Sequence, residues 1–212
     1  METKLLVSFL KSQHLKAKFT DRLKIVYRPY ICPFDELLEM VDHQDKVFDI
    51  GCGSGQFAML LAEFSKPSQI HGVEIAQHLV NNANELFKKY PEIDFNFNIY
   101  DGVTLPDAFS EATKIFMIDV LHHIPKHSQH AFLVHVYKRM QKGASLIIKD
   151  INAGSPFVYF NKIHDLVFAG EIGNEFSKTK LANTLQSLGF TIESSSTKTM
   201  YVYPHYTIVA KK

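Results

Sequence analysis

The sequence predicts an α/β fold, in which a doubly wound and mostly parallel sheet carries helices on both faces. Short apolar runs alternate with amphipathic helical patterns through the middle of the chain, as strands and crossover helices do. The first run, Val47–Ile50, ends in three glycines spaced two residues apart, Gly51, Gly53 and Gly55. With 46% hydrophobic residues, the 212-residue chain has the composition of one globular domain.

The N-terminal segment differs from the rest of the chain in its charge. Residues 1–28 hold seven Lys or Arg against two Asp or Glu, a net charge of +5, whereas the whole chain has +1. Apolar residues at helical spacing predict one or two amphipathic helices here. We interpret residues 1–33 as a helical cap and linker ahead of the main domain at 34–212. Docking to an acidic carrier protein or an anionic substrate, and a membrane-surface helix, are the alternatives.

The linker at 27–33 contains two prolines and should be extended or turned. Because it leads from the cap toward the glycine turn, it can cross the mouth of a pocket. Tyr27, Arg28 and Tyr30 are therefore candidate substrate or cofactor contacts, with ordinary surface packing as the alternative.

We predict the remaining helices and strands from the spacing of their hydrophobic residues and from the Gly and Pro residues that end them. The alternation in 94–100 places that strand near a sheet edge, whereas the continuous apolar run 115–118 is typical of a buried parallel strand. Ser177 is a candidate N-cap. The expected helices are 33–41, 57–62, 77–89, 125–141 and 177–186, and the expected strands are 47–50, 69–74, 94–100, 112–120, 144–149, 190–196 and 206–210.

Residues 151–176 break this rhythm. The segment begins aromatic and roughly helical and is then interrupted by Gly170 and Gly173. An apolar insertion after the fifth strand lies over the carboxyl edge of the sheet, so we expect it to form a substrate lid. Packing against the N-terminal cap is a second, compatible interpretation.

Two acidic residues around the glycine turn predict a nucleoside ligand. Asp49 precedes the turn, and Glu74 ends the next apolar run about 20 residues on, where a carboxylate can accept hydrogen bonds from both ribose hydroxyls. Glycines suit such a turn because its backbone takes positive φ and the ligand approaches the main chain closely. The spacing G-x-G-x-G differs from the G-x-G-x-x-G of dinucleotide enzymes. For the three glycines alone, a plain tight turn is the alternative.

Five segments together resemble the motifs of class I S-adenosylmethionine-dependent methyltransferases, and the fourth has the form common among small-molecule methyltransferases. They are Val47–Gln56, Gly72–Ile75, Asp101–Gly102, Phe116–Pro125 and Gly143–Asp150. The resemblance implies a seven-stranded Rossmann-like sheet with an antiparallel last strand, S-adenosylmethionine as cofactor and S-adenosylhomocysteine as product. It implies that the cofactor is bound by Asp49, Gly51, Gly53, Gly55, Glu74, Ile75, Asp101, Gly102 and Asp119.

Within this resemblance, Asp101 corresponds to the residue that accepts a hydrogen bond from the exocyclic amine of adenine. Because Asp101 precedes a glycine, capping of a turn is the alternative role.

Methyl transfer to a hydroxyl needs correct positioning and a general base. Histidine titrates near neutrality and suits that role. His123 is the first candidate base and His164 the second, while His122, Asp150 and His205 are expected to contact the substrate. Adjacent side chains usually diverge, so at most one of the paired histidines should face the pocket. No spacing of His and Cys residues predicts a metal site.

These observations favour a small-molecule methyltransferase that acts on oxygen or carbon. A non-catalytic cofactor-binding partner or regulatory protein, and an RNA-modifying methyltransferase that uses the basic N-terminus, are the alternatives. We expect no nucleic-acid partner, because the net charge is small and few aromatics interleave the basic stretch. Two cysteines without a disulfide pattern, and no apolar run near ~20 residues, predict a cytoplasmic protein without a membrane span.

Overall fold

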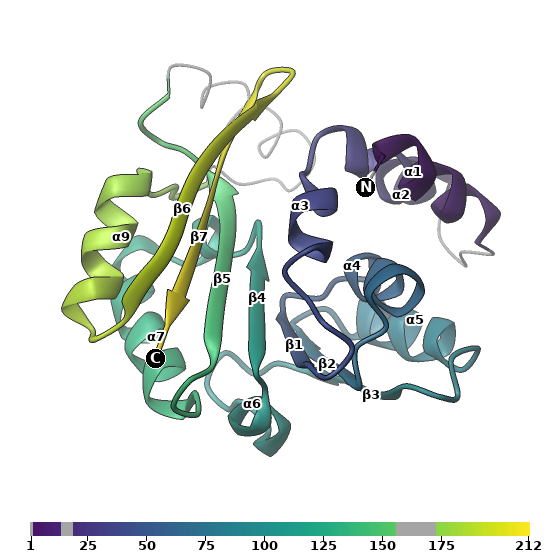
Figure 1. Ribbon diagram of the computed structural model, residues 1–212, viewed down its shortest axis with the longest axis horizontal. Coiled ribbons are helices and arrows are strands. Elements are labelled where there is room, and N and C mark those ends of the chain that lie inside the picture. The colour runs from purple at the N-terminus through teal and green to yellow at the C-terminus, as the bar shows by residue number, and fades with distance from the viewer. Residues whose placement is uncertain (1, 14–18, 156–172) are drawn as a thin grey trace. The chain divides into compact units, whose positions relative to one another are not determined.

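The computed structural model describes residues 2–13, 19–155 and 173–212, which form two compact units, Met1–Leu105 and Pro106–Lys212 (Figure 1). His164 and most of the expected lid at 151–176 lie outside the described residues. The division at residue 105 reflects how the chain packs and does not test the expected domain boundary after residue 33, which stays a prediction.

The first unit is built on three parallel strands, β1 (Lys46–Ile50), β2 (Gln69–Glu74) and β3 (Asp94–Ile99). β1 buries every residue after Lys46, as a strand covered on both faces must. β3 leaves most of its residues at least partly exposed and lies at the end of the sheet, which confirms the edge position predicted from its alternation.

The helices of the first unit surround these strands. α5 packs on β2 and β3, and the N-terminal helices pack on one another with Leu6, Val7 and Leu10 buried. In chain order they are α1 (Thr3–Ser12), α2 (Phe19–Tyr27), the 3-10 helix η1 (Arg28–Tyr30), α3 (Phe34–Leu38), α4 (Gln56–Leu60), the π-helical turn η2 (Leu61–Ser65) and α5 (Gln77–Phe87).

The second unit holds the other strands. β5 is buried along its whole length because β4 and β7 flank it, and α9 packs on β6 and β7. The Ser177 hydroxyl accepts from the Lys180 amide at 3.3 Å, which confirms the predicted N-cap of α9. The elements are α6 (Asp107–Glu111), β4 (Lys114–Ile118), the 3-10 helix η3 (Leu121–His123), α7 (Lys126–Arg139), β5 (Ser145–Ile151), α9 (Lys178–Ser187), β6 (Thr191–Met200) and β7 (Tyr203–Lys211).

Within the described residues the sheet has seven strands in the order β3-β2-β1-β4-β5-β7-β6. The pairs β1–β2, β2–β3 and β4–β5 are parallel, whereas β7 runs antiparallel to both β5 and β6. The predicted mostly parallel α/β sheet with an antiparallel last strand is therefore confirmed.

The last two strands are longer than the sequence predicted. They extend to pairs such as Met200 with Tyr203, beyond the end of β5, where Ile151 faces His205. The overhanging part consists of Thr199 and Met200 of β6 and of Tyr203 and Pro204 of β7 (Figure 1). β6 exposes most of its residues, many of them Ser or Thr, so its sequence carries no alternation of apolar residues that would mark its full length as strand.

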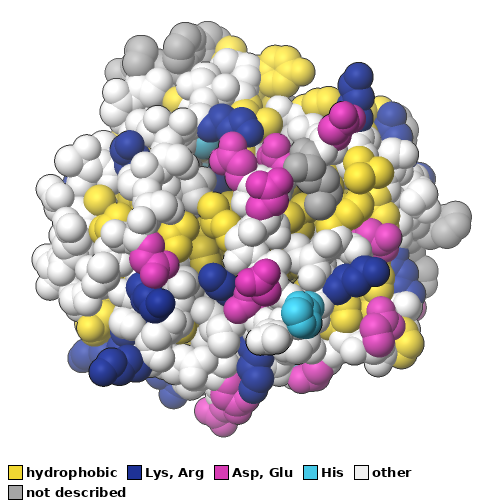
Figure 2. Space-filling view, in the orientation of Figure 1, with side chains coloured by type: hydrophobic (Ala, Val, Ile, Leu, Met, Phe, Trp, Pro, Cys, Tyr) yellow, Lys and Arg dark blue, Asp and Glu magenta, His cyan; other side chains and the backbone are white. Residues whose placement is uncertain are grey.

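Basic and acidic side chains are interspersed on the face shown in Figure 2, in keeping with a formal net charge of +1. In the described part of the chain, no helix combines the length and the apolar character that crossing a membrane requires.

Candidate functional site

The turn after β1 has the backbone conformation that its glycines allow. Gly51, Gly53 and Gly55 have φ of 76°, 54° and 78°, which other residues rarely adopt. The Gly51 amide donates to the Val73 carbonyl oxygen at 2.8 Å, which holds the turn against the end of β2. A Cβ at Gly53 would meet nothing within 4 Å, so the space in front of this residue is open. A ligand can therefore reach the main chain here.

Glu74 is tied to the glycine turn by its side chain. Its Oε2 accepts from the Gly53 amide at 3.0 Å, and its Oε1 accepts from the Ala76 amide at 3.1 Å. Each carboxylate oxygen has a second lone pair. The carboxylate is thus held at the end of β2 in one orientation and can still accept hydrogen bonds from a diol.

Asp49 is the buried acidic group of this region, with 3% of its surface exposed. Burial raises the pKa of its carboxyl to about 7; the nearby Arg28 opposes the rise and Glu74 adds to it. A buried carboxyl that titrates near neutrality gains charge readily when a cation binds beside it. The predicted role of Asp49 in binding the cofactor stays a prediction.

The carboxyl ends of β2 and β3 expose apolar side chains beside acidic ones. Ile75, directly after Glu74, is 74% exposed, and Val103, two residues after Asp101, is 70% exposed. Apolar surface of this kind suits a planar base. The contact of Ile75 with the cofactor, expected from the family motif, stays a prediction, and Val103 carries no motif that would single it out in the sequence.

Asp101 caps the turn that follows β3. Its Oδ1 accepts from the amides of Val103 at 2.8 Å and Thr104 at 2.6 Å, and these bonds lower the pKa of the carboxyl. Gly102 has φ of 86°, and a Cβ there would meet nothing within 4 Å. The turn-capping role is therefore present, and the contact with adenine stays a prediction.

The N-terminal helices are joined to the helix that follows the glycine turn. Gln56, the first residue of α4, donates from Nε2 to the Ile25 carbonyl oxygen at 2.5 Å. The rings of Tyr27 and Tyr30 stack with centroids 6.3 Å apart, and Tyr27 is 44% exposed with Lys11 Nζ over its ring. Their predicted contact with substrate stays a prediction.

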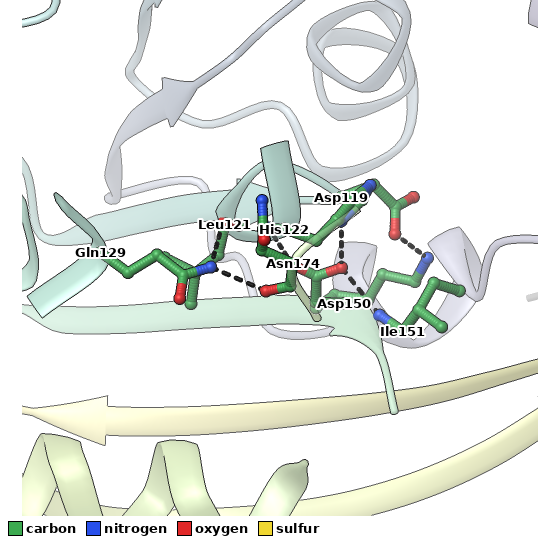
Figure 3. Close-up of polar contacts among 8 residues, drawn as sticks. Asp119, Leu121, His122, Gln129, Asp150, Ile151 and Asn174 are labelled. Carbon is green, nitrogen blue, oxygen red and sulfur yellow. Dashed lines mark hydrogen bonds and ion pairs between the residues drawn. The ribbon is translucent and has the colours of Figure 1, made fainter. Parts of the chain in front are cut away.

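In the second unit, η3 and the end of β5 form a His–Asp pair (Figure 3). His122 Nδ1 lies 2.5 Å from Asp150 Oδ1, and the His122 amide donates to Asp150 Oδ2 at 3.2 Å. The Ile151 amide also donates to Asp150 Oδ1, at 2.8 Å. The side chains of the pair are 3% and 2% exposed. Asp150 therefore fixes the position of the imidazole.

Asp119 and Lys149 form a second pair at this end of the sheet. Lys149 Nζ lies 2.6 Å from Asp119 Oδ1, and the lysine is fully buried while the Asp119 side chain is 22% exposed. Asp119 has φ of 56°, a conformation that costs a side-chain-bearing residue about 1–2 kcal/mol. The pair holds this strained turn in place. The predicted role of Asp119 in binding the cofactor stays a prediction.

His122 and His123 do not diverge as expected, because their ring centroids lie 4.0 Å apart. The short 3-10 turn keeps both rings on one side, where His122 is buried and His123 is exposed. His205 is buried on β7 opposite Ile151 and stacks on Tyr203 with an angle of 15° between the rings. Asp150 is thus a carboxylate partner of His122, and the predicted roles of His122, His123 and His205 stay predictions.

A methyltransferase-domain family model matches residues 24–195 of the chain. Methyltransferase 235L of Invertebrate iridescent virus 6 is 23% identical over 161 residues, covering 65% of this chain and 58% of its own length. The mitochondrial ubiquinone biosynthesis O-methyltransferase of Candida albicans is 26% identical over 122 residues, covering 56% of this chain and 35% of its own length. The chain thus spans less than two thirds of either relative.

Among solved structures, magnesium protoporphyrin IX methyltransferase from Synechocystis PCC 6803, with bound S-adenosylhomocysteine, superposes with a TM-score of 0.71. It is 16% identical and aligns over 99% of this chain and 94% of its own, a likeness that shows the fold alone. The family match extends over most of the sequence, and the sheet topology agrees with it. The chain belongs to the S-adenosylmethionine-dependent class I methyltransferase family.

Proposed function

We propose that the protein transfers the methyl group of S-adenosylmethionine to an oxygen of a small organic acceptor, with His122 as the general base. The observation that carries this proposal is the buried pair in which Asp150 holds His122 Nδ1 at 2.5 Å. The relative from Candida albicans is named an O-methyltransferase of ubiquinone biosynthesis, which supports an oxygen acceptor. An acidic carbon is the second candidate, since the same pair could take its proton.

S-adenosylmethionine, when bound, supplies an electrophilic methyl group on a sulfonium with a neutral leaving group. In the first unit, the glycine turn and Asp49 would hold its amino-acid part, and Glu74 its ribose. Ile75 and Val103 would cover the faces of the adenine. The open space at Gly53 and the fixed carboxylate of Glu74 support this assignment.

The proposed chemistry of the second unit is proton transfer. Because Nδ1 is bound to Asp150, the ring exchanges protons with an acceptor hydroxyl through Nε2. The Asp150 carboxylate stabilises the imidazolium that forms. A positioned base of this kind contributes roughly 10²–10⁴-fold to the rate.

The test compares His122→Ala with His123→Ala, with S-adenosylhomocysteine release measured on a phenol panel that includes 2-hydroxyacetophenone and 2-ethylphenol. We expect His122→Ala to lower kcat by about 10²-fold or more and His123→Ala to retain most of it. Calorimetry with S-adenosylhomocysteine should give equal affinities for both variants and the wild type. The opposite ranking of the two variants would assign the base role to His123.

The two other functions make distinct predictions. A non-catalytic partner protein would bind S-adenosylhomocysteine tightly and turn over no member of the panel. An RNA-modifying enzyme would bind RNA with an affinity that falls steeply as salt rises. Turnover of a phenol together with salt-insensitive or absent RNA binding would exclude both.

A further inference from the structure

Gln129, near the start of α7, is buried and joins two distant parts of the second unit (Figure 3). Its Nε2 donates to the Leu121 carbonyl oxygen at 3.0 Å and to the Asn174 carbonyl oxygen at 2.8 Å. A side-chain amide has two N–H groups, so these two bonds use its full donor capacity. One glutamine therefore links η3 to the segment that precedes α9.

The segment at 173–176 in turn lies directly on His122. The Asn174 amide donates to the His122 carbonyl oxygen at 2.7 Å. A Cβ on Gly173 would come within 3.0 Å of His122 Cδ2, so the glycine backbone packs against the imidazole ring. An alanine here would crowd the ring and the Glu175 carboxylate, both of which its Cβ would meet at 3.0 Å.

η3 has little internal structure to hold it. Its own backbone bonds are His123 to Val120 at 3.0 Å and Ile124 to Leu121 at 3.2 Å. Among the described contacts, Asp150 bonds the His122 ring itself, whereas Asn174 and Gln129 hold the backbone that carries it. A shift of about 1 Å in a catalytic group can lower a rate by about 10²-fold.

We propose that Gln129 is a positioning residue that, through Leu121 and Asn174, holds the His122 ring in register with Asp150. The residue acts through the backbone of η3 and touches neither cofactor nor acceptor. The proposal rests on the proposed function only for its effect on turnover, because the state of the imidazole can be observed without an acceptor.

The test uses Gln129→Met, which keeps the length of the side chain and removes both donated hydrogen bonds. Gln141→Met is a matched control, because Gln141 Nε2 also donates to two carbonyl oxygens, those of Glu111 at 2.8 Å and Ala112 at 2.9 Å. Gly173→Ala displaces the same ring directly and shows how the measured signal responds when the ring moves, and Gln129→Leu replaces Gln129→Met if the latter folds poorly.

The first readout is the proton NMR signal of the His122 Nδ1–H in its hydrogen bond to Asp150, assigned by its loss in His122→Ala. We expect Gln129→Met and Gly173→Ala to move this signal upfield or broaden it, and Gln141→Met to leave it in place. An unchanged signal in Gln129→Met would overturn the proposal, whether or not the protein methylates any acceptor.

The second readout is the pH profile of kcat on the best phenol of the panel. Gln129→Met should lower kcat by about 10–10²-fold and move the acidic limb to lower pH, since the imidazolium loses part of its carboxylate stabilisation. Calorimetric affinity for S-adenosylhomocysteine should stay within twofold. A changed NMR signal with unchanged kcat would leave the positioning role intact and contradict His122 as the base.

Discussion

At the scale of single residues, Asp49 couples stability to pH. An exposed Asp carboxyl titrates near pH 3.9, whereas burial raises the pKa of Asp49 to about 7. The folded protein therefore binds this proton more tightly than the unfolded chain does. The resulting stability is fully present below about pH 4 and is lost as pH rises toward about 7, by roughly 4 kcal/mol at 1.36 kcal/mol per pKa unit.

Asp49→Asn should remove this dependence, because an amide does not titrate. We expect the variant to lose less stability than the wild type between pH 4.5 and pH 7.5, and to be the more stable protein at the upper end. Urea unfolding across that range measures the difference. Asp107→Asn is the control, since its side chain is fully exposed. Parallel slopes for Asp49→Asn and the wild type would show that the buried carboxyl is not the cause.

At the scale of elements, the glycine turn distinguishes backbone strain from steric crowding at two of its positions, Gly53 and Gly55. Gly53 and Gly55 both have positive φ, so alanine at either position is strained by about 1–2 kcal/mol. At Gly55 the new Cβ would also lie 3.2 Å from Ala83 Cβ of α5, whereas at Gly53 it would enter open space. The two positions therefore differ in what a methyl group meets.

Gly55→Ala should accordingly lower stability more than Gly53→Ala, because only the former crowds α5. Gly53→Ala should weaken S-adenosylhomocysteine binding more than its loss of stability explains, because its methyl group enters the space proposed for the ligand. Urea unfolding and calorimetry on both variants test this crossed pattern. Equal losses of affinity in the two variants would contradict the assignment of that space to the cofactor.

At the scale of the whole molecule, the packing of the N-terminal helix α1 indicates whether the basic segment stabilises the fold or serves as a docking element. Leu6, Val7 and Leu10 are at most 3% exposed, and Phe9 packs edge-on against Phe64 of η2. Each buried aliphatic side chain contributes about 1.5–3 kcal/mol. The helix should therefore belong to the core of the first unit.

Deleting residues 2–13 should lower the free energy of unfolding by roughly 4.5–9 kcal/mol, an upper estimate for three such side chains. Urea unfolding of the shortened chain measures the loss. The exposed Lys4→Gln change should leave stability within about 0.5 kcal/mol of the wild type. A shortened chain as stable as the full one would instead favour α1 as a docking element.

The sequence predicted those features whose signals are local. Gly53 and Glu74 were found because a fixed spacing joins a strand end, a turn and the next strand end. The sequence predicted the His–Asp pair only in part. Spacing singles out His122, His123 and Asp150, but it does not show which of the two imidazole rings is bonded to the carboxylate. That choice depends on a contact between residues 28 positions apart.

Other buried polar groups of the second unit gave no local signal. Gln129 reads as an ordinary helix residue, and its importance lies in its bond to Asn174, 45 positions away. Tyr206 is buried opposite Asp150, with a hydroxyl that has no hydrogen-bond partner within the described residues. Burial and the charge of Asp150 raise its pKa well above the usual range, so it remains a proton donor. Such roles depend on tertiary contacts, which periodicity does not record.

The insertion of β7 between β5 and β6 has a consequence for how the chain folds. β7 pairs with both β5 and β6 but is synthesised after both of them. The whole of β6 is therefore synthesised before β5 can pair with β7. Both strands keep an unsatisfied edge until Tyr203–Lys211 arrives. Long-range pairing of this kind slows folding and leaves an interval open to aggregation. The nascent chain should therefore be most dependent on chaperones just before β7 leaves the ribosome.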